Sequence, residues 1–260
     1  MKKDFGYFKI SVIEFIIAAV ILLLSILLFS IIADEIVIEK ESSFDTHVFT
    51  YISSFTTPFV TRAAMIVTNF GSGYFLIPAY LCIIFYHIKN KKNQEAIVVA
   101  IVATVSLLSG WLLKDLFHRP RPQLPLISGA GGYSFPSGHS LGGFTFSGVL
   151  IYLIWRTLLS PFLKWILSIL LVIFSLLIGL SRIYLRVHFA SDVLGSLLVT
   201  VVWLSLTFII METIEKKTHA NEKLSNWSFA KRIPSRFLGF CVHGSFCKSG
   251  WFFLNLSFIF

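Results

Sequence analysis

Long apolar runs alternate with short polar segments along this chain, and their lengths indicate its fold class. Six runs predict helices that cross a membrane, at about residues 10–33, 62–88, 95–117, 138–158, 162–182 and 189–211. A helix needs roughly 20 residues to span the hydrocarbon core of a bilayer, and the runs are close to that length. Gly71 and Gly73 interrupt the second run, so that helix is expected to kink or to begin as an interfacial turn. The pattern predicts an all-α, polytopic membrane protein with six transmembrane helices in one bundle.

The composition agrees with a membrane location. Of the 260 residues, 56% are hydrophobic and only 13% are charged, whereas a soluble domain has about 25% charged residues. The first apolar run is longer than the core of a signal peptide and lacks a clear cleavage site, so we interpret it as a retained helix. Residues 34–61 are acidic at first and then amphipathic, which predicts a short helix on the membrane surface. Cys82, inside the second run, is expected to be buried.

The end of the chain breaks the pattern of long apolar runs. Residues 221–260 mix aromatic, basic and small side chains without helical periodicity, and their last apolar piece is too short to span a bilayer. We therefore divide the chain into a six-helix membrane domain, residues 1–220, and a C-terminal tail, residues 221–260. The tail is expected to have no catalytic role.

Basic residues are concentrated in segments between the apolar runs and account for most of the net charge of +9. Because basic loops stay on the cytoplasmic side, these segments belong to one face of the membrane. They contain Lys2, Lys3 and Lys9; Lys89, Lys91 and Lys92; Arg156 and Lys164; and Lys216, Lys217 and Lys223. Both termini are therefore predicted to be cytoplasmic, and segments 34–61, 118–137 and 183–188 to face outside. Because topology explains the charge and no nucleic-acid-reading module is recognisable, nucleic acid is not an expected partner.

Three polar clusters stand at the ends of apolar runs, all on the predicted outer side. They run from Lys114 to Pro122, from Pro136 to His139, and from Ser181 to Asp192. Their candidate site residues are the histidines His139 and His188, the carboxylate of Asp192 and the cations Lys114, Arg121 and Arg182. Such a set can hold a phosphate group, attack it and protonate its leaving group. The clusters therefore predict a phosphatase that is embedded in the membrane.

The three cations are candidates for holding the phosphate. Lys114, Arg121 and Arg182 could face the oxygens of a phosphoryl group and stabilise the charge that spreads over them. The alternative is that each one only reaches toward lipid headgroups. Ser137 is a plausible N-cap of the fourth helix, and Gly138 would let the backbone approach an anion closely. We therefore expect these five residues to bind phosphate.

The remaining polar residues suggest the chemistry. His188 and Asp192 are four residues apart and share a helix face, so Asp192 could orient the imidazole and leave its other nitrogen to attack phosphorus. The alternative is an ion pair without a catalytic role. His139 is the candidate general acid. His118 and Arg119 are expected to face solvent or headgroups. Because the histidines form no zinc pattern and the cations would repel a divalent ion, no metal or other cofactor is expected.

In order and spacing, the clusters resemble the signature of the type 2 phosphatidic acid phosphatase superfamily. That signature is Lys, six residues, Arg-Pro; then Pro-Ser-Gly-His; then Ser-Arg, five residues, His, three residues, Asp. This sequence matches it at Lys114 with Arg121-Pro122, at Pro136-Ser137-Gly138-His139, and at Ser181-Arg182 with His188 and Asp192. The resemblance covers about residues 60–211 and leaves the C-terminal tail outside.

The resemblance implies a metal-independent phosphatase of the cell membrane with a phosphohistidine intermediate at His188. Asp192 would orient His188, and His139 would act as the acid. The chain looks like bacterial phosphatidylglycerophosphate and undecaprenyl-diphosphate phosphatases, so the expected partners are a lipid phosphate substrate and the surrounding lipids. A lipid phosphotransferase and a non-enzymatic lipid-phosphate transporter remain alternatives. The sequence leaves open the exact lipid, monophosphate against diphosphate, the oligomeric state and any protein partner.

Overall fold

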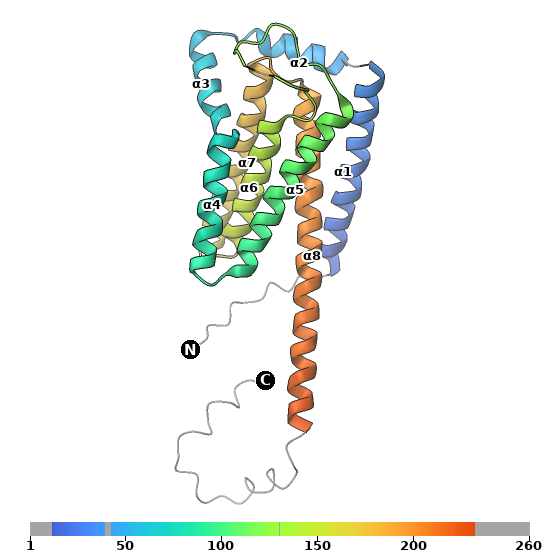
Figure 1. Ribbon diagram of the computed structural model, residues 1–260, viewed down its shortest axis with the longest axis vertical. Helices are drawn as coiled ribbons and strands as arrows, with labels where there is room; N and C mark the ends of the chain where they lie inside the picture. Colours follow the sequence, from blue (N-terminus) through green and yellow to red (C-terminus); the bar gives the residue numbers. More distant parts are fainter. Residues whose placement is uncertain (1–11, 40–42, 130, 232–260) are drawn as a thin grey trace, which may run out of the picture. The chain divides into compact units, whose positions relative to one another are not determined.

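The computed structural model describes residues 12–39, 43–129 and 131–231, and every regular element within them is helical (Figure 1). The helices are α1 (Val12–Glu39), α2 (Ser43–Ser53), α3 (Pro58–Asn69), α4 (Gly73–Lys89), α5 (Asn93–Phe117), α6 (Gly138–Trp155), α7 (Pro161–Tyr184) and α8 (Ala190–Lys231). The predicted all-α class is confirmed.

Among the described residues, five segments are long and apolar enough to cross a membrane. They are Ile13–Ile36, Pro58–Lys89, Asn93–Phe117, Pro161–Tyr184 and Ala190–Met211. The predicted polytopic membrane protein is therefore confirmed. Helix α6, expected as the fourth span, is not among these segments, and its first half carries Gly, His, Ser and Thr. The count of six spans stays a prediction.

The second predicted helix is divided into α3 and α4, as its glycines suggested. Thr57 caps α3, because its side chain accepts a hydrogen bond from the backbone of Val60. The chain then turns between Asn69 and Gly73 and continues as α4. A Cβ atom on Gly71 would lie 2.6 Å from the carbonyl oxygen of His139 and 2.8 Å from a methyl group of Ile178. The interruption thus brings the backbone of this turn against the start of α6.

The predicted surface segment does contain a helix, α2, which lies across one end of the bundle (Figure 1). Its acidic residue Asp45 is only 1% exposed, although it belongs to the segment that was predicted to lie on the membrane surface. This burial is possible because Asp45 pairs with Arg119 and Ser191.

Hydroxyl groups inside the bundle are paired across helices. Ser106 of α5 bonds Thr145 of α6 at 2.8 Å, and Thr145 lies 3.3 Å from Thr200 of α8. Such pairs satisfy polar groups that the hydrocarbon core could not. The expectation for Cys82 was wrong, because this residue is exposed on α4. In a membrane bundle an apolar residue can be stable facing lipid, so an apolar run does not imply burial in the protein.

The chain divides into two compact units, with the boundary after Met211. The domain boundary predicted at residue 220 falls inside α8, and most of the predicted tail, residues 232–260, lies outside the described residues. Its expected lack of a catalytic role stays a prediction.

The contact at Gly71 can be tested with two neighbouring glycines. Gly71→Ala should lower the free energy of unfolding by about 1–3 kcal/mol, because the new methyl group would press on backbone that has little room to move. Gly73→Ala is the matched control, since its Cβ would lie 3.8 Å from the nearest atom, in Ile77. Thermal unfolding of both variants in detergent measures the difference. Equal stability of the two variants would contradict this packing.

Candidate active site

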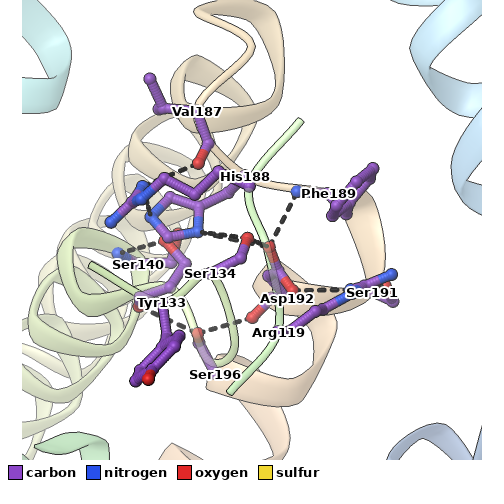
Figure 2. A network of polar contacts seen from close by, with 12 residues as sticks. Arg119, Tyr133, Ser134, Ser140, Val187, His188, Phe189, Ser191, Asp192 and Ser196 are labelled. Atoms are coloured by element: carbon purple, nitrogen blue, oxygen red, sulfur yellow. Dashed lines mark hydrogen bonds and ion pairs between the residues drawn. The ribbon is translucent and has the colours of Figure 1, made fainter. Parts of the chain in front are cut away.

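All three sequence clusters meet at the end of the bundle where α2 lies. Helix α5 and the loop after it bring Lys114, Arg119 and Arg121, while α6 begins at Gly138. The end of α7, the connection after it and the first turn of α8 bring Arg182, His188 and Asp192. Figure 2 shows Ser134, His188 and Asp192 converging at the centre of this arrangement.

Asp192 is fully buried and is satisfied at both oxygens. Its Oδ2 accepts hydrogen bonds from the backbone N–H of Phe189, at 2.9 Å, and from the hydroxyl of Ser134. The same oxygen lies 3.3 Å from His188 Nδ1. Its Oδ1 accepts from Arg119 at 2.6 Å. Because all of these partners are donors, the carboxylate is ionised and accepts the proton of Nδ1.

The other imidazole nitrogen faces a cation. Arg121 Nη1 lies 3.1 Å from His188 Nε2, and a guanidinium can only donate, so Nε2 is the accepting, unprotonated nitrogen. Burial lowers the pKa of His188 to about 4, against the opposing effect of Asp192. The charges of Arg121 and Arg182 lower it further. His188 is therefore a neutral imidazole whose lone pair is on Nε2.

Backbone carbonyl groups hold the guanidinium of Arg121 in place. Its Nε donates to Gly132 at 3.0 Å, its Nη2 to Gly131 at 2.9 Å, and its Nη1 to Val187 at 2.8 Å. Gly132 has a φ of +71°, a conformation that favours glycine and lets the loop turn its carbonyl groups toward the arginine. The loop from Gly131 to Ser134, here called the glycine-rich loop, thus positions a cation beside His188.

The same loop positions Lys114. Its ammonium group donates to the carbonyl oxygens of Tyr133, at 2.7 Å, and Ser134, at 3.3 Å. A Cβ on Gly138 would lie 4.0 Å from Lys114 Cε, so the lysine packs near the start of α6. This agrees with the predicted closeness of Lys114 and Gly138.

Arg182 is buried and only partly satisfied. Its Nη1 donates to Thr68 Oγ1 of α3 at 2.8 Å, while its Nε has no hydrogen-bond partner among the described residues. A buried donor without a partner is costly, so this edge of the guanidinium is suited to an anion. Thr68 also lines a cavity of about 510 Å³ between α3 and residues 126–128. The cavity adjoins the predicted phosphate site through this threonine.

The start of α6 has the predicted cap. The side chain of Ser137 accepts from the backbone of Ser140 at 3.4 Å, and the two hydroxyl groups lie 2.8 Å apart. Ser137 is fully buried, whereas Gly138 is exposed and His139 is half-buried. The N-cap is confirmed. With its hydroxyl bonded to Ser140, Ser137 is better placed to present the helix start than to contact a ligand through its side chain.

The prediction that Arg119 faces solvent or headgroups was wrong. Arg119 is 2% exposed and lies between Asp45 and Asp192, with its guanidinium 4.2 Å from the ring centroid of Phe189. His118, beside it, is exposed as predicted. The partners Ser134, Asp45 and Ser191 were also missed by the sequence analysis. The only local signal was that Arg119 lies two residues before Arg121, in the sequence Arg119-Pro120-Arg121-Pro122. Nothing in the neighbouring sequence connects Arg119 to Asp45.

The part of the chain that carries these clusters matches a known family. A family model of the PAP2 superfamily matches residues 94–216. Phosphatidylglycerophosphatase B of Bacillus subtilis is 31% identical over 144 residues, which cover 53% of this chain and 68% of that protein. The chain belongs to the PAP2 superfamily. The resemblance seen in the sequence is thereby confirmed, and so is the phosphatase class.

Two further matches agree with this assignment. A putative undecaprenyl-diphosphatase of Escherichia coli, YbjG, is 32% identical, covering 53% of this chain and 67% of that protein. The crystal structure of a transmembrane PAP2-type phosphatidylglycerolphosphate phosphatase from Bacillus subtilis superposes with a TM-score of 0.68 at 28% identity. That match covers 74% of this chain and 96% of the other.

Metal ligands do not gather at this PAP2 site. Within residues 12–39, 43–129 and 131–231, no three His, Cys, Asp or Glu side chains are grouped so that they could hold a metal ion. The predicted independence from metals stays a prediction.

The protonation state of His188 can be measured directly. Nitrogen NMR of the histidine-labelled protein at pH 6 should show a neutral ring protonated at Nδ1, with the second proton bound only near pH 4. Because the unfolded chain binds that proton near pH 6.5, the free energy of unfolding should fall as pH drops from about 6.5 to 4. His188→Gln identifies the signal and removes this part of the pH dependence. A cationic His188 at pH 6 would contradict the geometry.

Proposed function

We propose that this PAP2 protein hydrolyses the phosphate monoester or diphosphate of a membrane lipid through a phosphohistidine at His188. The supporting observation is the placement of the His188 imidazole, whose Nδ1 faces Asp192 and whose Nε2 faces Arg121. An ion pair with no catalytic role would not need its second nitrogen next to an arginine. That nitrogen is beside a cation that could hold a phosphate group within its reach.

In the first step, His188 Nε2 attacks phosphorus and forms an N–P bond. The bond between phosphorus and the lipid-side oxygen breaks, and its electron pair stays on that oxygen. His139 gives a proton to the departing oxygen. A bound phosphate dianion offsets the neighbouring cations and so favours the protonated form of His139. Asp192 stabilises the positive charge that develops on the imidazole of His188.

In the second step, His139 accepts a proton from water, and the water oxygen attacks phosphorus. The N–P bond breaks, inorganic phosphate leaves, and His188 returns to its neutral form. In both steps Lys114, Arg121 and Arg182 stabilise the equatorial oxygens of the phosphoryl group. Gly138 and the capped start of α6 supply backbone N–H groups to the same anion.

Lipid phosphates suit the place of the site in the fold. The site lies at one end of a helix bundle whose outer surfaces are apolar, so a lipid tail can stay in the bilayer while its phosphate enters. The names of the relatives point to phosphatidylglycerophosphate and undecaprenyl diphosphate as candidates.

The nucleophile can be tested by substitution and trapping. His188→Ala should abolish release of inorganic phosphate from phosphatidylglycerophosphate, phosphatidate and undecaprenyl diphosphate. Asp192→Asn should lower kcat by about 10²–10⁴-fold, because it disturbs the imidazole but keeps the attacking atom. Labelled substrate should leave acid-labile phosphate on the wild-type protein and none on His188→Ala.

His47→Ala is the control, since His47 is exposed on α2 and should leave turnover unchanged. Phosphate release by His188→Ala would reject the mechanism. Transfer of phosphate to an added alcohol in place of water would identify a phosphotransferase. Binding of the lipid without either product would identify a transporter.

We also propose that the site faces the extracytoplasmic side and that both termini are cytoplasmic. The turns at the opposite end of the bundle, between α4 and α5 and between α6 and α7, carry Lys89, Lys91, Lys92, Arg156 and Lys164. Basic residues in short loops favour the cytoplasm. Lys2, Lys3 and Lys9, which supported the same orientation, lie outside the described residues.

Two exposed positions test the orientation. After replacement of the native cysteines, Ser128→Cys, in the loop at the site end, should react with an impermeant maleimide on intact cells. Asn90→Cys, in the turn between α4 and α5, should react only after permeabilisation. Both residues are exposed, so accessibility within the protein does not distinguish them. The reverse labelling pattern would place the site in the cytoplasm.

A further inference from the structure

A buried group of charges surrounds Oδ1 of Asp192, the oxygen that does not face His188. Arg119 is 2.7 Å from Asp45 Oδ2 and 2.6 Å from Asp192 Oδ1, and all three side chains are at most 1% exposed. The ring of Phe189 lies against the guanidinium. One arginine thus joins helix α2, the loop after α5 and the first turn of α8.

Asp45 also holds the start of α8. Its Oδ1 accepts from the backbone N–H of Ser191 at 2.8 Å, and its Oδ2 accepts from the hydroxyl of Ser191 at 2.5 Å. That hydroxyl in turn accepts from Arg119 at 2.7 Å. The first turn of a helix carries a partial positive charge, which favours a carboxylate there. Asp45 therefore fixes the residue next to Asp192 from a distant segment.

The balance of charge in this group is unusual for a purely structural contact. Two carboxylates share one guanidinium, although a single partner would neutralise it, and a second buried carboxylate is costly. The effect of Asp45 is to offset part of the positive charge of Arg119. Asp192 then keeps more of its negative charge for the imidazole, while the hydrogen bond from Arg119 to Oδ1 leaves Oδ2 to face His188.

We propose that Asp45 and Arg119 are positioning residues, which together set the orientation and the charge of Asp192 and, through it, the reactivity of His188. The proposal rests on the proposed role of His188 as nucleophile. Arg119 contacts Asp192 directly, and Asp45 acts through Arg119 and Ser191, so both residues reach the carboxylate that faces His188. Their effect should therefore appear at the histidine.

The expected signature is a pair of opposite pH shifts that cancel. Protonation of His188 removes the attacking lone pair, so activity falls as pH drops through its pKa. Arg119→Gln removes a positive charge, which should raise the pKa of His188 and move the acid limb of kcat/KM up by about one pH unit. Asp45→Asn removes a negative charge, which should lower the pKa of His188 and move the limb below its wild-type position. The double variant should return it close to the wild-type position.

Other charges around His188 stay constant in these variants. They are Asp192 of α8, Arg121 of the loop, Arg182 of α7, His139 of α6 and Lys114 of α5. Arg119→Lys keeps the positive charge but loses the planar guanidinium that binds Asp45 and Asp192 together. The acid limb of kcat/KM should therefore stay at its wild-type position while kcat falls. Asp34→Asn removes an exposed carboxylate of α1 and is the matched control, with no change expected.

The titration of His188, followed by nitrogen NMR in the same variants, makes the test independent of turnover. Shifted titrations without phosphate release by the wild type would support the positioning role and reject the proposed function. Phosphate release through His188 with the same acid limb in Arg119→Gln, Asp45→Asn and the wild type would reject the positioning role. If Arg119→Gln does not fold, Asp45→Asn still decides the question, because the positioning role predicts a lowered limb and a lowered His188 titration, whereas a purely structural contact predicts that both are unchanged.

Discussion

A carboxylate buried at the start of a membrane helix has to be satisfied at both of its oxygens, and this requirement organises the site around Asp192. The donors come from the loop after α5 and from the connection between α7 and α8. Each donor fixes one of these segments relative to α8. Because the same carboxylate orients His188, the contacts that stabilise the fold here also determine which nitrogen of the imidazole carries a proton.

The cations of the site are held by two different kinds of partner. Lys114 and Arg121 are held by carbonyl groups of the glycine-rich loop, which are neutral acceptors, and their charge is therefore not cancelled. Arg119 is held by carboxylates, and its charge is consumed within the protein. Two arginines separated by one proline thus differ in the kind of partner that holds them. Arg121 therefore keeps a charge that can act on a ligand, whereas the charge of Arg119 stabilises the protein.

Much of the fold and the site could be predicted from local pattern. Apolar runs gave the helices, the glycines near residue 71 marked the break between α3 and α4, and Ser137 was recognised as a cap. Spacing alone paired His188 with Asp192. Asp45, Arg119 and Ser191 could not be assigned, since their roles arise from contacts across 74 and 146 positions of sequence. The exposure of Cys82 was missed because lipid and protein interior are equally apolar surroundings.

The surroundings of His188 are asymmetric, and this has a consequence for the regiochemistry of the proposed intermediate. A ring flip would exchange the two nitrogens, placing an N–H against the guanidinium of Arg121 and a lone pair against the carboxylate of Asp192. Both new contacts would be repulsive in a buried site, so the ring is restricted to one of its two orientations. A phosphoryl group arriving from the side of Arg121 would therefore be directed to Nε2, and the Nδ1 isomer of the phosphohistidine would not form.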